Sequence, residues 1–211
     1  MPGRLYEATW GRVFAAGYDR FLAASERAGL REQRRGALAG ASGSTLEIGA
    51  GTGLNLELYP PTVTELVLTE PSEHMASRLR GRPASVTVAE VIEAPAEKLP
   101  FGDDRFDTVA ATLVLCTVPD PAGALSEVAR VLKPGGRFLF LEHVRSPEPG
   151  LARWQDRLER PWKAFGVGCH CNRDTAAAIE GSRLTLDRVE TGRIPKAVPL
   201  VRPMIVGSAH A

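Results

Sequence analysis

Three features are scarce in this chain of 211 residues, and each absence excludes a class of protein. It has three cysteines, an odd number that does not make the disulfide framework of a small secreted protein. Its first ten residues hold no apolar core of a signal peptide, and no run approaches the roughly 20 apolar residues that span a bilayer. We therefore expect a cytoplasmic protein without stable membrane insertion, for which peripheral membrane contact stays open.

An excess of charge of one sign is also lacking. The chain has 26 basic and 25 acidic residues, a net charge of +1. Such a balance creates no global field that attracts nucleic acid or an anionic membrane. We expect a small-molecule partner and no nucleic acid. The length suits one well-buried domain, present as a monomer or a homodimer.

Short apolar runs alternate with helical patterns along the chain. Strands are expected near residues 45–48, 65–69, 85–88, 106–112, 137–142, 184–190 and 204–208, and helices near 6–21, 25–38, 72–80, 120–132, 151–165 and 173–180. Strands separated by helical crossovers predict a three-layer α/β fold. We expect a Rossmann-like sheet, mostly parallel with an antiparallel final strand and with helices on both faces.

This pattern divides the single predicted domain, residues 1–211, into four parts. Residues 1–40 form an N-terminal helical lid, and residues 41–145 form the core that binds a nucleotide-like ligand. Residues 146–183 form a helical segment beside that core, and residues 184–211 supply the last strands.

The most informative segment is the glycine-rich turn after the first predicted strand, where residues 45–53 read TLEIGAGTG. Glycine permits positive φ and close approach of a ligand to the backbone. The turn is expected to open a helix at about Leu54, whose free amides can meet an anionic group. Leu54 also holds the place where the dinucleotide fingerprint requires its third glycine, so a nicotinamide-dependent oxidoreductase is disfavoured.

The glycines at 49, 51 and 53, with an acidic residue two places before them, resemble motif I of the class I S-adenosylmethionine-dependent methyltransferases. This resemblance implies S-adenosyl-L-methionine as cofactor and S-adenosyl-L-homocysteine as product. It places the following residues of the turn at the cofactor: Glu47, Gly49, Ala50, Gly51, Thr52, Gly53 and Asn55.

Further cofactor-binding residues are expected at the ends of the next strands, because ligands of such sheets bind at the carboxyl edge. Glu70 follows the second strand, where an acidic side chain can accept hydrogen bonds from ribose hydroxyls. The segment 94–101, APAEKLPF, resembles the family's adenine-reading segment, although its usual Asp is replaced by Pro. The full set expected here is Glu70, Pro71, Met75, Ala96, Glu97, Thr112 and Leu113.

Two residues near the predicted methyl position carry competing interpretations. His143 follows a strand and is our candidate general base, since a protonated acceptor must lose its proton. A structural role at the strand end is the alternative. Cys116 ends an apolar run and is expected in the core rather than as a nucleophile.

The string Cys169-His170-Cys171 suggests a metal site, but a structural zinc needs four ligands and no well-placed fourth follows. We therefore expect no metal site, at this string or elsewhere in the chain.

Several later segments resemble one subgroup, the methyltransferase-like thiol S-methyltransferases, whose animal members sit on membranes and methylate small alkyl thiols. The resemblance rests on residues 112–118, 141–144 and 200–207, with Trp154, Trp162, Gly168-Cys169 and Arg173. It implies a small, rather apolar acceptor, with a thiol favoured. An apolar pocket lined by Tyr18, Trp154 and Trp162 is expected to hold it.

The acceptor stays open at this point. Quinone C-methyltransferases and phospholipid or amine N-methyltransferases are also similar and would use such a pocket. A non-catalytic cofactor-binding protein is the alternative of another class.

Overall fold

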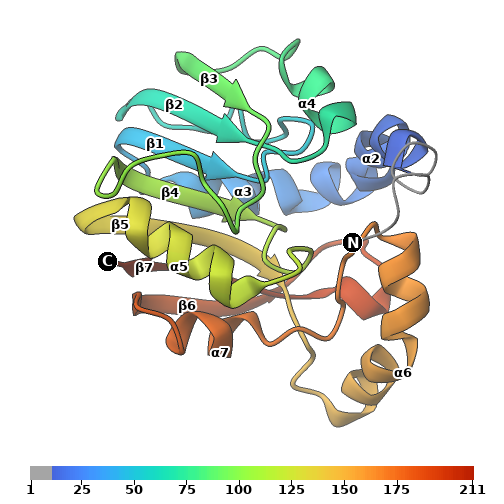
Figure 1. Cartoon of the computed structure of the whole chain (residues 1–211). Helices are drawn as coiled ribbons and strands as arrows, with labels where there is room; N and C mark the ends of the chain where they lie inside the picture. Colours follow the sequence, from blue (N-terminus) through green and yellow to red (C-terminus); the bar gives the residue numbers. More distant parts are fainter. Residues whose placement is uncertain (1–10) are drawn as a thin grey trace.

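The computed structural model describes residues 11–211, and its centre is a seven-stranded sheet (Figure 1). The strand order is β3-β2-β1-β4-β5-β7-β6, and β7 runs antiparallel to both of its neighbours. This arrangement confirms the predicted mostly parallel α/β fold. The strands are β1 Gly43–Ile48, β2 Val63–Thr69, β3 Val88–Ile92, β4 Phe106–Thr112, β5 Leu132–His143, β6 Thr185–Arg193 and β7 Pro203–His210.

Helices cover both faces of the sheet and one of its ends. In Figure 1, α5 and α7 lie on one face and α3 lies on the other, while α2 and α6 lie beyond the carboxyl ends of the parallel strands. Part of the predicted first helix, including Tyr6 and Trp10, lies outside the described residues. The helical elements are α2 Arg12–Ser25, the π-helical η2 Glu26–Leu30, α3 Arg31–Leu38, α4 Glu73–Leu79, α5 Pro121–Val131, α6 Pro149–Phe165, α7 Thr175–Glu180 and the 3-10 helix η3 Pro199–Val201.

Alternate residues of the central strand β4 face two separate apolar clusters. Val109 packs with Leu125 of α5, whereas the next residue, Ala110, packs with Leu38 of α3. Both faces of the strand are therefore buried, which explains its nearly continuous apolar sequence. The helix α5 begins as predicted, because the side chain of Asp120 accepts a hydrogen bond from the Gly123 amide at 3.1 Å.

Two local predictions were wrong. No helix begins at Leu54; residues 54–58 form turns instead, closed by hydrogen bonds such as Leu58 N–H to Asn55 O at 2.8 Å. Pro60 and Pro61 follow Tyr59 and prevent a helix from continuing, because proline disfavours helical backbone in the residue before it. The strand β3 begins at Val88, later than expected.

Within residues 11–211, no helix is both long and apolar enough to cross a membrane.

Candidate functional site

The glycine turn has the backbone conformation that the sequence predicts. Gly49 and Gly51 have φ of 59° and 58°, the left-handed region that side chains rarely adopt. A Cβ on Gly49 would lie 2.8 Å from both methyl groups of Val114, so the turn is packed against the segment that follows β4. A Cβ on Gly51 would meet only the oxygen of Gly49, at 4.0 Å, so this residue borders open space.

Glu70 joins the turn to the end of β2. One of its carboxylate oxygens accepts a hydrogen bond from the Gly51 amide at 2.8 Å, and the other accepts one from the Ser72 amide at 2.9 Å. Burial raises the pKa of Glu70, and the two amide bonds oppose that shift. Each carboxylate oxygen keeps a further lone pair, which leaves the residue able to accept hydrogen bonds from two vicinal hydroxyls.

Glu47 lies behind the turn, at the end of β1. Its two carboxylate oxygens accept hydrogen bonds from Asn55 Nδ2 and the Tyr59 hydroxyl, both at 2.8 Å. Burial raises the pKa of Glu47 to about 7, although both hydrogen bonds and Arg34 act in the opposite direction. Glu47 therefore supports Asn55, with both of its oxygens already bound within the protein.

A buried arginine completes this part of the site, and the sequence analysis missed it. Arg34 of α3 donates to the Thr112 hydroxyl at 2.6 Å and to Asn55 Oδ1 at 3.3 Å, and its Nε donates to Glu26 at 2.9 Å. Its side chain is only 3% exposed. The cavity beside it is lined by Tyr18, Arg34, Gly49, Ala50, Gly51, Thr52, Leu54, Asn55, Thr112 and Leu113.

The helix α2 lies over this cavity. Asp19 accepts a hydrogen bond from the Thr52 hydroxyl and forms an ion pair with Arg82. Tyr18, one residue earlier, lines the cavity. Burial raises the pKa of Tyr18 to about 12; Arg34 lowers it, while Cys116, Cys169 and Glu70 raise it.

The residues expected at an adenine ring follow β2 and β3 in the chain. Pro71 is exposed and Met75 is half-buried on α4. Ala96 is buried in the core, and the carboxylate of Glu97 accepts a hydrogen bond from the Asp120 amide at 3.2 Å.

The other half of the site is the loop after β4, residues 113–118. Its backbone turns at Leu113, whose φ is 60° despite its side chain. The fully buried carboxylate of Glu142 accepts hydrogen bonds from three successive amides, those of Val114, Leu115 and Cys116, at 2.8, 2.9 and 3.3 Å. Because the loop is folded around this carboxylate, the position of Cys116 is fixed by β5.

A second clamp holds the carbonyl groups of the same loop. Arg173 donates to the carbonyl oxygens of Leu115 and Val118 at 2.5 and 2.7 Å. The His170 amide donates to the Cys116 carbonyl at 2.8 Å. The segment around residue 170 is therefore fastened directly to the loop that carries Cys116.

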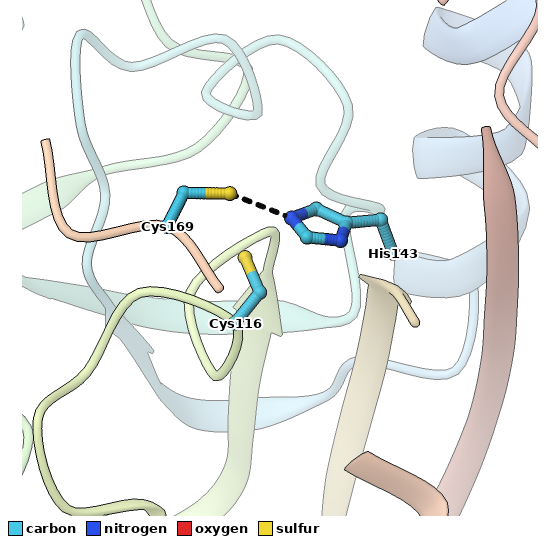
Figure 2. Close-up of side chains that lie close together, drawn as sticks. All are labelled: Cys116, His143 and Cys169. Atoms are coloured by element: carbon cyan, nitrogen blue, oxygen red, sulfur yellow. Dashed lines mark hydrogen bonds between the residues drawn. The ribbon is translucent and has the colours of Figure 1, made fainter. Parts of the chain in front are cut away.

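These clamps bring together Cys116, His143 and Cys169, which we call the thiol–imidazole cluster (Figure 2). His143 Nε2 lies 2.9 Å from Cys169 Sγ, and Trp162 Nε1 donates to the same sulfur at 3.2 Å. His143 is 4% exposed, and its Nδ1 has no hydrogen-bond partner among residues 11–211.

Electrostatics within the cluster favour a neutral Cys116 thiol. The hydrogen bond with Cys169, together with burial, raises the pKa of Cys116 well above its usual range. Burial by itself would lower the pKa of His143, but Cys116 and Glu142 outweigh it and the pKa is raised.

The structure does not bring all three predicted acceptor-site aromatics together. Tyr18 lines the cavity and Trp162 contacts Cys169. Trp154 lies on the outer side of α6, where it is 54% exposed and the Arg157 guanidinium covers its ring at 5.6 Å.

The geometry fits a nucleoside cofactor without a pyrophosphate. The left-handed glycines leave backbone open to a ligand, and Glu70 stands at the end of the neighbouring strand. Residues 54–58 directly after the turn form turns, so they offer no helix N-terminus to a phosphate. Fold and site together define a Rossmann-like protein that binds such a cofactor at the carboxyl edge of its sheet.

Comparison with known proteins identifies the kind of cofactor and enzyme. A family model described as a methyltransferase domain matches residues 46–140. The human thiol S-methyltransferase TMT1B is 36% identical over 192 residues, which cover 88% of this chain and 78% of that protein. A phosphatidylethanolamine N-methyltransferase of Cereibacter sphaeroides is 35% identical over 121 residues, covering 56% of this chain and 59% of that protein. A SAM-dependent methyltransferase from Thermotoga maritima shares the fold, with a TM-score of 0.67 and 24% identity, covering 94% of this chain and 97% of that one.

The chain therefore belongs to the class I S-adenosylmethionine-dependent methyltransferases. It is an enzyme of that class and resembles the thiol S-methyltransferase subgroup within it.

Proposed function

We propose that this enzyme transfers the methyl group of S-adenosylmethionine to a small, rather apolar thiol. The observation that carries the proposal is the extent of the similarity to the human thiol S-methyltransferase. An alignment over 88% of the chain must reach beyond the cofactor-binding core 41–145 into the segments beside the acceptor. The match to the phospholipid N-methyltransferase covers 56% of the chain, little more than the length of that core.

The cofactor would occupy the cavity at the glycine turn. Glu70 would accept the ribose hydroxyls, and the backbone of residues 49–53 would lie along the methionine part. Arg34, with its buried guanidinium beside Thr112, is suited to the methionine carboxylate. Met75, Ala96 and Glu97 would contact the adenine. Glu47 would act through Asn55, since both of its oxygens are already bound.

The acceptor would enter between α2 and α6. Tyr18 borders the cofactor cavity, Trp162 contacts the thiol–imidazole cluster, and the rings of Phe21 and Phe165 meet at 6.4 Å between the two helices. In this proposal α2 is a lid, held over the turn by Asp19. Trp154 would take no part in the pocket and would be available to a membrane surface.

Methyl transfer to a thiol requires loss of a proton. The thiol R–SH becomes a thiolate, its sulfur attacks the methyl carbon, and the sulfonium carbon–sulfur bond breaks to leave neutral S-adenosylhomocysteine. Alignment of the reactants supplies most of the acceleration, up to about 7–11 kcal/mol. His143 is our candidate base, because it is the imidazole next to the loop that borders the cofactor cavity.

Two measurements test this function. Calorimetric titration with S-adenosylhomocysteine should give one site per chain. A panel of alkyl thiols, quinones and phospholipid amines, assayed for release of S-adenosylhomocysteine, should show turnover with the thiols. Turnover with a quinone or a lipid amine and none with any thiol would refute the thiol assignment and leave the cofactor assignment standing.

A further inference from the structure

The thiol–imidazole cluster has the composition of a metal site. One nitrogen and two sulfur atoms, from Cys116, His143 and Cys169, all lie within 4.8 Å of one another. Figure 2 shows the Nε2 edge of the ring turned toward both sulfurs. Two cysteines and one histidine, with a fourth position left to water or substrate, are a known donor set of catalytic zinc.

The spacing of the three atoms is close to what a tetrahedral ion requires. Zinc binds sulfur at about 2.3 Å and imidazole nitrogen at about 2.0–2.1 Å, so ligand atoms stand about 3.5 to 3.8 Å apart. The separation of 2.9 Å between His143 Nε2 and Cys169 Sγ is shorter than this, so an ion would require these two atoms to move slightly apart.

Each ligand is held by groups outside the cluster. Cys116 is fixed through the Glu142 carboxylate and Arg173. His143 ends β5, where it pairs with Met204 of β7. The Cys169 segment is fastened through the His170 amide to the Cys116 carbonyl. Ligands that such contacts already hold in place bind an ion at low cost in conformational entropy.

The string Cys169-His170-Cys171, by contrast, does not converge. The Cys171 thiol donates to the Gln155 carbonyl at 3.5 Å, and His170 Nδ1 lies 2.8 Å from Glu159. We predicted no metal from this string. The cluster takes only Cys169 from it and adds Cys116 from the loop after β4 and His143 from the end of β5.

The cluster also lies where a thiol acceptor would have to react. Leu113, three residues before Cys116, lines the cofactor cavity. Val114, two residues before Cys116, packs against Gly49 of the turn, which lines the same cavity. A ligand at the open position of the cluster would therefore stand next to the cofactor.

We propose that Cys116, His143 and Cys169 bind one Zn²⁺ ion, and that its fourth position takes the sulfur of the acceptor. The metal site stands on the cluster alone; its use in catalysis rests on the proposed thiol methylation. The bound R–SH gives its proton to water and stays as a thiolate, whose lone pair forms the new bond to the methyl carbon. The product R–S–CH₃ is a neutral thioether, a weaker ligand that leaves the position free. In this arrangement His143 is a ligand rather than the base.

Cobalt substitution tests the site directly. The full chain, reduced and freed of metal with a chelator, should bind one Co²⁺ and show the visible and thiolate charge-transfer bands of tetrahedral coordination. Cys116→Ser, Cys169→Ser and His143→Ala should lose these bands. Cys171→Ser is the matched control and should keep them, because Cys171 lies outside the cluster. Binding of S-adenosylhomocysteine by each variant shows that it is folded.

Several outcomes would overturn the proposal. One is the absence of thiolate bands in the wild-type chain at stoichiometric Co²⁺; another is retention of the bands in Cys169→Ser. A third is an enzymatically active chain in which only Cys171 titrates as a free thiol. Cys116 and Cys169 would then be joined in a disulfide and could not bind the ion.

The role of the ion is tested separately. A small alkyl thiol should shift the cobalt bands, and removal of metal should lower thiol turnover at least about tenfold without changing cofactor affinity. Cobalt bands in a chain that methylates no thiol would refute the proposed function but not the metal site. Thiol turnover by a chain that binds no metal would refute the site but not the function.

Discussion

The two ends of the site are built by different means. At the cofactor end, the bonds of the turn join residues close in the chain: Asn55 donates to Glu47 eight residues away, and Gly51 donates to Glu70 nineteen residues away. At the proposed acceptor end, the loop after β4, Glu142 accepts hydrogen bonds from amides 26 to 28 residues away. Arg173 donates hydrogen bonds to carbonyl groups 55 and 58 residues away. Local backbone conformation therefore shapes the glycine turn itself, although Arg34 beside it is bound to Thr112, 78 residues away. Buried long-range polar contacts shape the loop after β4.

The largest effect is expected at the acceptor end. Glu142→Ala leaves three buried amides without an acceptor, and each such amide costs about 1–3 kcal/mol. We expect the free energy of unfolding, measured with urea, to fall by at least about 3 kcal/mol. The control Glu148→Ala, at an exposed ion pair with Arg193, should change it by less than about 1 kcal/mol. Equal small losses in both variants would show that the carboxylate does not hold the loop.

At the cofactor end, a buried carboxyl should make stability depend on pH. The pKa of Glu47 is about 7 in the fold against a usual 4.5, so the fold favours its protonated form. The stability that this protonated carboxyl gives the fold is fully present below 4.5, the pKa of Glu47 in the unfolded chain. It is lost as the pH rises through the folded pKa of about 7. Glu47→Gln should remove this loss, worth up to about 3 kcal/mol.

The measurement is the difference in melting temperature between Glu47→Gln and the wild type, which should grow from about pH 5 to about pH 8. Glu57→Gln, at an exposed carboxylate of the same segment, is the matched control. A difference that is constant with pH would contradict the prediction.

The smallest change in stability is expected at the glycine turn, where a change in ligand binding tests whether the turn belongs to the cofactor end. Gly51→Ala and Gly135→Ala both place a side chain at positive φ, of 58° and 74°, with little nearby to clash. Each should lose about 1–2 kcal/mol of stability. Gly51→Ala alone should also weaken binding of S-adenosylhomocysteine, about tenfold by calorimetry, because only Gly51 borders the cavity. Similar affinities for the two variants would remove the turn from the cofactor site.

The contrast between the two ends also explains which features could be predicted from the sequence. Most strands and the positive φ of the glycine turn follow from local patterns, and these predictions were confirmed. The cofactor-binding roles of the turn and of Glu70 stay predictions. Arg34 was missed because it stands among other arginines at 31 and 35, and only its contacts with Glu26 and Thr112 distinguish it. Cys116, His143 and Cys169 were each noticed, yet their meeting depends on how Glu142 and Arg173 fold the loop between them.

The position of β7 has a consequence for the order in which the molecule can be completed during synthesis. The strand β7 pairs with β5 on one side and with β6 on the other. Until residues 203–210 have left the ribosome, the apolar strand β5 has an unpaired edge and β6 has no neighbour in the sheet. A nascent chain that already carries every cofactor residue therefore still exposes a strand edge open to aggregation. His143 gains its pairing with Met204 only when β7 is inserted, so the proposed acceptor end is completed after the cofactor end.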